Sequence, residues 1–373
     1  MIDLDQNATT PLRSEALEAM LPWLRAGANA SSLHRAGQEA RAALDEAREQ
    51  VALALGCSPK ELTFTSGGTE SDNLALRGML SRGGRLVTTS VEHAAVRETA
   101  RALEKSGVEV VSLQVNSCGE LDWNEVERAV QPGTTLVSAM WVNNETGVVF
   151  PIEQLGLLCR ERGVPLHVDA VQAFGKLPID LSVLPVDLLT VSAHKVGGPQ
   201  GAGALFVRRG RSIDAMQTGG LQERGRRGGT ENVAAIVGFG VAASLAEAER
   251  EKVMARLCLL EARLRERLLS DLDDVRVTGE GAERLPTTLH LCVKGAPSEA
   301  LLMALDQAGI AASSGSACSS GSLEPSGVLR AMGVASEWAR GALRLSMGRT
   351  TTPDEIERAA AIIVQAIGRV RSR

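Results

Sequence analysis

The sequence predicts an α/β protein in which a mostly parallel sheet is covered by helices, together with a smaller α+β domain. Two observations predict this fold class. Strand-like and helix-like segments alternate from about residue 14 to residue 255, as in parallel sheets with helices on both faces. The alternation stops at about residue 256, and a length of 373 residues suits two domains rather than one. We therefore assign residues 14–255 to a large domain, and residues 1–13 and 256–373 to a small domain.

The individual elements follow from the period of the apolar residues. In the large domain we expect strands at 61–65, 85–89, 108–115, 136–142, 164–168, 188–192 and 204–207. Helices are expected at 14–26, 34–55, 93–105, 122–130 and 151–162, with further helices starting at residue 69 and at about residue 231. In the small domain, strands at 289–293 and 343–346 flank helices at 298–308 and 353–367.

Composition excludes several classes of protein. The formal net charge is -5, so there is no basic surplus to suggest a nucleic-acid-binding surface. The first residues lack a basic region followed by an apolar stretch, and no run of about 18 apolar residues occurs, so neither a secretory signal nor a membrane span is expected. Six cysteines in 373 residues do not make a disulfide framework, and the absence of a C-x-x-C pair argues against a zinc ribbon. A reducing cytoplasm fits best.

Two charged residues at strand ends indicate cofactor chemistry. Lys195 follows a buried-looking strand and precedes a Gly-rich loop, where a lysine can lose its proton and form a Schiff base. Asp169 closes another strand, where a carboxylate can hold the pyridinium proton of pyridoxal phosphate. Taken singly, Lys195 could be a surface residue and Asp169 a helix cap. Together they meet the needs of this cofactor.

A Gly-rich turn and a histidine could complete such a site. The turn TSGGTE at residues 65–70 lies between a strand and a helix, where backbone N–H groups can bind a phosphate. Thr69 adds a hydroxyl, and Ser192 and His194 could reach the same phosphate, although such a turn can also be purely structural. His93 begins a helix whose dipole would keep the imidazole neutral for stacking or for acid–base work, unless it is only a capping or core residue.

The Gly/Ser-rich run SSGSACSSGS at residues 313–322 contains Cys318. It offers little to anchor a core, so we expect a mobile, exposed loop and a reactive thiol. The other cysteines, in ordinary helices, strands and turns, are expected to be inert core or surface residues; they are Cys57, Cys118, Cys159, Cys258 and Cys292.

These motifs resemble those of the NifS/IscS-type cysteine desulfurases, in the class V aminotransferase branch of fold-type I pyridoxal-phosphate enzymes. The resemblance covers nearly the whole chain and follows the family's order and spacing. Its motifs are LDQNATTP, FTSGGTESDNLA, EHAAV, WVNNETGVV, HVDAVQAFGKLPID, SAHKVGGPQGAGAL, QERGRRGGTEN, SSGSACSSGSLEPSGVLRAMG and LRLSMGRTT. The sequence departs from the family at three positions: Gly228 replaces a usual Ser, Gly327 a usual His or Tyr, and Gln200 a usual Lys. None of these changes removes a catalytic group.

The resemblance implies a role for each matching residue. Lys195 would carry the cofactor as a Schiff base, and His93 would stack on the ring and act in proton transfer. Other implied cofactor ligands are Asp169 at the pyridinium nitrogen, Gln172 at the ring oxygen, Asn144, and Gly68, Thr69, Ser192 and His194 at the phosphate. Thr230 would reach the phosphate of the other subunit of a homodimer. Asn144 and Arg344 would bind the substrate carboxylate, with Asn29 as a neighbour.

The activity that the resemblance implies is conversion of L-cysteine to L-alanine, with the sulfur transferred to Cys318 as a persulfide. The implied acceptor is a scaffold protein of the IscU/NifU type for iron–sulfur cluster assembly, and tRNA thiolation is a further outlet. Cys318 could also ligate iron transiently, in a 2Fe–2S cluster shared with that scaffold. Neither nucleic acid nor a membrane is expected as a direct partner.

Other classes of protein stay open to test. A selenocysteine lyase or an aminotransferase would use the same cofactor, although an aminotransferase needs no thiol. A Rossmann dehydrogenase is suggested by GPQGAG at residues 198–203, but that run leads into a predicted strand rather than a helix. A non-catalytic iron–sulfur scaffold would need more ligands than Cys318 alone provides.

Overall fold

The computed structural model of the chain describes residues 1–315 and 326–372. Its main sheet has seven strands in the order β2-β8-β7-β6-β5-β3-β4. These are β2 (Leu62–Thr65), β3 (Arg85–Thr89), β4 (Glu109–Leu113), β5 (Leu136–Met140), β6 (Leu166–Asp169), β7 (Leu188–Ser192) and β8 (Gly203–Val207). Only β8 pairs antiparallel to its two neighbours in this sheet. The prediction of a mostly parallel sheet is therefore confirmed.

Helices cover both faces of this sheet, and the strand sequences explain why. Consecutive strand residues point to opposite faces, and they enter different hydrophobic clusters: Leu86 and Leu136 pack in one, and Val87 and Val137 in the other. The first cluster takes in α3 (Gly68–Met79) and α4 (Ala94–Lys105), and the second takes in α2 (Arg35–Leu55) and α6 (Ile152–Glu161). Both faces are thus buried, as parallel strands require.

The remaining large helices lie around this core. They are α1 (Ser14–Arg25), which packs with α2 against α7 (Val233–Asp271), and the short α5 (Trp123–Ala129) beside β4. Helix α7 is 39 residues long and continues past the predicted domain boundary at residue 256. Its first half packs on the large core through residues such as Phe239 and Ala243, and its second half on the small core through Leu260 and Leu264. The change in sequence pattern at residue 256 therefore marks a change of packing partner.

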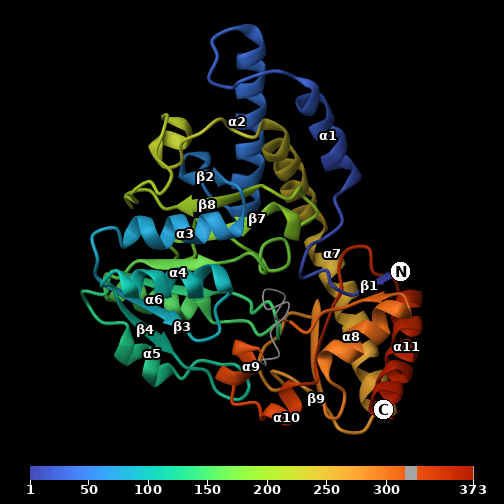
Figure 1. Cartoon of the computed structure of the whole chain (residues 1–373). Helices are drawn as coiled ribbons and strands as arrows, with labels where there is room; N and C mark the ends of the chain where they lie inside the picture. The colour runs from blue at the N-terminus through green and yellow to red at the C-terminus, as the bar shows by residue number, and fades with distance from the viewer. Residues whose placement is uncertain (316–325, 373) are drawn as a thin grey trace.

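The small α+β part also forms as predicted, with additional short elements. An antiparallel sheet has the order β12-β10-β9, made by β9 (Val275–Val277), β10 (Thr288–Val293) and β12 (Ala342–Ser346). Its helices are α8 (Ser298–Gln307), α9 (Gly327–Ala331), α10 (Ser336–Ala339) and α11 (Pro353–Arg371). Both chain termini lie in this part (Figure 1). No helix in the described ranges is both long and apolar enough to span a membrane.

A two-stranded parallel pair, which the sequence did not predict, anchors the N-terminus. Strand β1 (Ile2–Asp3) pairs with β11 (Ile310–Ala311), so the first residues join the small part. Ile2 and Leu4 belong to the hydrophobic cluster of that part, whereas the predicted small domain takes in residues 1–13 and 256–373. Three buried residues of that range, Leu285, Val328 and Met332, belong instead to the large cluster. The two-domain division stays a prediction.

Candidate functional site

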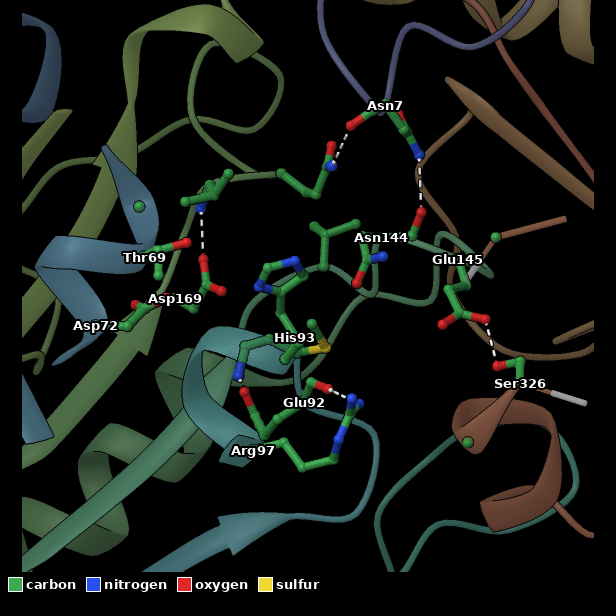
Figure 2. Close-up of a pocket in the computed structure, with 18 of the residues that line it drawn as sticks. Asn7, Thr69, Asp72, Glu92, His93, Arg97, Asn144, Glu145, Asp169 and Ser326 are labelled. Atoms are coloured by element: carbon green, nitrogen blue, oxygen red, sulfur yellow. Dashed lines mark hydrogen bonds between the residues drawn. The ribbon is translucent and has the colours of Figure 1, made fainter. Parts of the chain in front are cut away.

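A cavity of about 920 Å³ lies where the carboxyl ends of the parallel strands meet the small part of the chain. Most of the predicted site residues line it: Gly68, Thr69, His93, Asn144, Asp169, Gln172, Ser192, His194, Lys195 and Arg344. They come from strand ends, helix starts and β12, which are far apart in sequence. Figure 2 shows His93, Asp169 and Thr69 around the same space. The fold thus gathers these residues where open α/β sheets bind ligands.

The amine and the carboxylate sit at the ends of neighbouring parallel strands. Asp169 is the last residue of β6, and Lys195 ends the short 3-10 helix η2 (Ala193–Lys195) that follows β7. Lys195 Nζ donates to the backbone oxygens of Asn7 at 2.5 Å and Ala8 at 2.7 Å. Asp169 Oδ1 accepts the Val171 N–H at 2.9 Å. Burial raises the pKa of Asp169, and the nearby His93 and Lys195 oppose that rise, so this carboxyl has an increased tendency to share a proton.

The start of α3 forms a cradle that suits a phosphate. Its N-cap, Gly67, has φ 148°, and the helix begins at Gly68 with its N-terminal N–H groups near Ser192 and His194. Ser192 is 2% exposed, and its Oγ has no hydrogen-bond partner among the described residues. A buried hydroxyl without a partner is costly unless a ligand completes it. Lysine, carboxylate and cradle therefore fit pyridoxal phosphate.

Gly203 explains the Gly-rich run that resembles a dinucleotide fingerprint. A Cβ at Gly203 would lie 2.6 Å from the Gly67 Cα, so only glycine lets β8 approach the cradle this closely. The run leads into strand β8 rather than a helix. The expected failure of the Rossmann fingerprint is confirmed.

His93 is the N-cap of α4, as predicted, and its tautomer is fixed by its neighbour. Its Nδ1 accepts the Ala95 N–H at 3.2 Å, so in the neutral ring the proton is on Nε2. Burial is the main cause that lowers the pKa of His93; Lys195 and Arg97 lower it further and Asp169 opposes them. The helix dipole was the expected cause, and this attribution is corrected to burial.

Arg344 brings a buried guanidinium to the cavity from β12. It is 2% exposed, and its NH1 donates to the Asn144 backbone oxygen at 3.0 Å. Its NH2 pairs with Asp5 Oδ1 at 2.6 Å. The Nε atom has no hydrogen-bond partner within residues 1–315 and 326–372. Arg344 therefore ties the N-terminal segment, the loop at Asn144 and β12 together at one wall of the cavity.

Of the predicted site residues in the described part of the chain, two do not line this cavity. Thr230 and Asn29 are exposed and do not line it. Asn29 Oδ1 accepts the Ser31 N–H at 2.8 Å, and a role of Asn29 at the substrate carboxylate stays a prediction. Cys318 lies outside the described residues. Of the loop predicted to be exposed at 313–322, the described start is not exposed, because Ser313 and Gly315 are buried.

Several lining residues were missed by the sequence analysis. Asn7 is 3% exposed, and besides contacting Lys195 it donates through Nδ2 to the Asn144 oxygen at 3.2 Å (Figure 2). Three buried acids, Asp72, Glu92 and Glu145, also line the cavity. Burial raises the pKa of Glu92 to about 8, although its Oε1 accepts from Thr89 and Met140. The sequence did carry a signal for these three acids, because each of them lies inside one of the motifs that resemble the family.

No group of three or more His, Cys, Asp or Glu residues that could hold a metal occurs in the described part of the chain. Burial raises the pKa of Cys57 and of Cys159 to about 12. Those two thiols stay protonated at neutral pH and are poor nucleophiles, which agrees with the expectation that they are inert.

Comparison with known proteins places the chain in a family. The Aminotransferase class-V family matches residues 2–359. A cysteine desulfurase of Nostoc sp. (strain PCC 7120) is 45% identical, over 100% of this chain and 94% of that protein. A solved NifS-like protein has a TM-score of 0.92 at 35% identity, covering 98% of this chain and 99% of its own. The structure of SspA in complex with cysteine has a TM-score of 0.83 at 34% identity, covering 94% and 100%. The chain therefore belongs to the class-V aminotransferase family of pyridoxal-phosphate enzymes, among its cysteine desulfurases of the NifS/IscS type.

Proposed function

We propose that this protein takes sulfur from L-cysteine, holds it on Cys318 as a persulfide and releases L-alanine. The observation that carries the proposal is the placement of the Lys195 amine and the Asp169 carboxylate at adjacent strand ends, facing the same cavity as the α3 cradle. This is the set of groups that pyridoxal phosphate needs. The cysteine-bound structure of SspA, similar over 94% of this chain, supports cysteine as the substrate.

The cofactor would be held by residues from several strand ends and helix starts. Lys195 would hold it covalently through Nζ, Asp169 would face the ring nitrogen, and Gln172 and His93 would contact the ring. Gly68, Thr69, Ser192 and His194 would hold the phosphate. When bound, pyridoxal phosphate supplies an electron sink for charge that develops at the substrate Cα.

Protons would move at two defined atoms. Lys195 Nζ is kept at the strand ends by the Asn7 and Ala8 carbonyl oxygens, and it would take the proton from the substrate Cα. His93 carries its ring proton on Nε2, because Nδ1 is engaged by the Ala95 N–H. Because its pKa is below the ordinary value, His93 is neutral at neutral pH and would offer its Nε2 proton to a group in the cavity.

The substrate carboxylate would bind at the wall made by Arg344 and Asn144. The Arg344 guanidinium is buried, and a charge-assisted hydrogen bond to a carboxylate is strong in such surroundings. Asp5 already balances part of this charge from the other side. A substrate carboxylate would therefore bind a guanidinium whose position is fixed in advance, which lowers the cost of ordering it.

Sulfur transfer requires Cys318 close to the cavity, and its short separation from Gly315 in the sequence permits this. Gly315 lines the cavity, and three residues extend at most about 11 Å. Cys318 would lose its proton and attack the substrate sulfur, forming an S–S bond while the Cβ–S bond breaks. The sulfur stays on Cys318 as a persulfide. The three-carbon product keeps the electron pair of the broken bond, takes a proton at Cβ, regains the one removed from Cα, and leaves as L-alanine.

Partners are proposed from the family resemblance. The active form would be a homodimer in which exposed Thr230 reaches the phosphate of the other subunit. The persulfide would pass to a scaffold protein of the IscU/NifU type for iron–sulfur assembly, with tRNA thiolation as a further outlet. A 2Fe–2S cluster ligated by Cys318 would exist only during that transfer. We propose the cytoplasm as its location.

Incubation with L-cysteine tests the proposal directly. We expect L-alanine to form and the peptide containing Cys318 to gain the mass of one sulfur atom. The matched control is Cys258→Ser, which changes an exposed cysteine on α7 and should leave both results unchanged. Alanine production at the parental rate by Cys318→Ala would refute the nucleophile. Failure of the parent protein to form alanine would refute the activity.

A further inference from the structure

A second lysine, Lys176, lies behind the candidate site and has no part in the proposed mechanism. It follows β6 in the motif HVDAVQAFGK and lines a smaller cavity of about 60 Å³ on the far side of Lys195. Its Nζ donates a hydrogen bond to Gln172 Oε1 at 2.8 Å. No carboxylate of the described residues pairs with it, so this amide is its hydrogen-bond partner there.

This contact determines which way the Gln172 amide points. Gln172 is 5% exposed, and its Nε2 donates to the Asn7 backbone oxygen at 3.0 Å. The same oxygen accepts from Lys195 Nζ at 2.5 Å. With Oε1 taken by Lys176 and Nε2 by Asn7, the amide has one orientation that satisfies both ends, because a flip would set Oε1 against the Asn7 carbonyl oxygen.

We propose that Lys176 is a positioning residue that holds the Gln172 amide with its N–H edge toward the cofactor. The proposal rests on the proposed function, in which Gln172 contacts the cofactor ring oxygen. Gln172 Nε2 carries a second hydrogen that is not used by any acceptor within residues 1–315 and 326–372. An amide that flipped would instead offer a carbonyl oxygen to the ring oxygen, and two acceptors repel.

The contact works in either protonation state of Lys176. Burial, with Lys195 and Arg344 nearby, lowers the pKa of Lys176 to about 7. The other charged groups at this cavity are Arg349 and Arg13, which is paired with Glu249 at 2.9 Å. Both an ammonium and a neutral amine donate hydrogen bonds, so the Gln172 orientation persists on both sides of neutral pH.

The test is a double-mutant cycle on cofactor binding. In Lys176→Met we expect added pyridoxal phosphate to bind about tenfold more weakly, because this factor corresponds to the loss of about one hydrogen bond. We also expect a shift of the absorbance maximum of the bound cofactor. Lys176→Arg keeps a donor, has the small cavity to extend into, and should recover most of the affinity. In a Gln172→Leu background, Lys176→Met should cause no further loss, because the amide through which it acts is gone.

Two results would overturn the positioning role. One is parental affinity and absorbance in Lys176→Met. The other is an equal loss in the Gln172→Leu background, which would mean that Lys176 acts independently of the amide. Urea unfolding of the cofactor-free variants serves as the structural readout. A loss in the free energy of unfolding as large as the loss in the free energy of cofactor binding would count against the proposal. Absence of binding by the parent protein would refute the proposed function together with this inference.

Discussion

Removing the Ser192 hydroxyl should affect the cofactor-free and cofactor-bound protein in opposite directions. The hydroxyl is buried and without a partner among the described residues, and such a group costs free energy when it is withdrawn from water. We expect Ser192→Ala to leave the free energy of unfolding of the cofactor-free protein unchanged or to raise it by up to about 1 kcal/mol. Most polar-to-alanine changes in a core have the opposite sign.

Binding of pyridoxal phosphate should weaken in the same variant. A hydrogen bond to a charged group contributes about 1.5–3 kcal/mol, so losing the one to the phosphate should raise the dissociation constant roughly 10- to 150-fold. The assays are urea unfolding of the cofactor-free protein and titration of the cofactor by absorbance.

Ser138→Ala is the matched control on β5. Ser138 Oγ is also buried, but it has a partner, His167 Nδ1 at 2.9 Å. This variant should lose about 1 kcal/mol of stability and keep its affinity for the cofactor. If Ser192→Ala behaved like Ser138→Ala in both assays, the cradle as drawn here would be wrong.

Three further variants test other parts of the structure. Lys195→Ala should lose both the absorbance of covalently held cofactor and alanine production; retention of that absorbance would move the attachment elsewhere. Arg48→Met should lower the free energy of unfolding by about 3–5 kcal/mol, because it leaves Glu223, now bound at 2.6 and 2.8 Å, as a buried unpaired carboxylate; a loss below 1 kcal/mol in urea unfolding contradicts this. Burial lowers the pKa of His167 to about 3, against about 6.5 in the unfolded chain. Between these two pH values the unfolded state binds more protons than the folded state. The free energy of unfolding therefore falls as the pH falls through this range. The stability of His167→Gln should therefore fall less steeply over this range, by up to about 1.4 kcal/mol per pH unit, and parallel pH profiles would contradict the assignment.

The local parts of the fold could be predicted from the sequence because their signals are local. Apolar periodicity and helix-ending glycines depend only on residues close together in the sequence. The alternation of strands and helices was therefore predicted correctly, with ends shifted by a few residues. The strand predicted at 164–168 forms as Leu166–Asp169, which makes Asp169 part of the strand rather than the residue after it. This shift does not change the edge of the sheet at which the carboxylate lies.

Long-range contacts could not be predicted in this way. Asn7 reaches the site because β1 pairs with β11 across about three hundred residues, and Asp5 reaches Arg344 by the same route. No local period encodes such a pairing. The family motif LDQNATTP marked the segment as special without saying what its residues contact. The cause of the lowered pKa of His93 was missed for a related reason, since burial depends on the packing of several elements.

The 39-residue helix α7 has a consequence for how the protein unfolds. At about 1.5 Å per residue it is roughly 58 Å long, and it contributes residues to both hydrophobic clusters. If either cluster unfolds, one half of α7 loses the residues that it packs against. That half is then only marginally stable as a helix in water. Calorimetry of the intact chain should accordingly show a single heat-absorption peak, even though the sequence pattern predicts two domains.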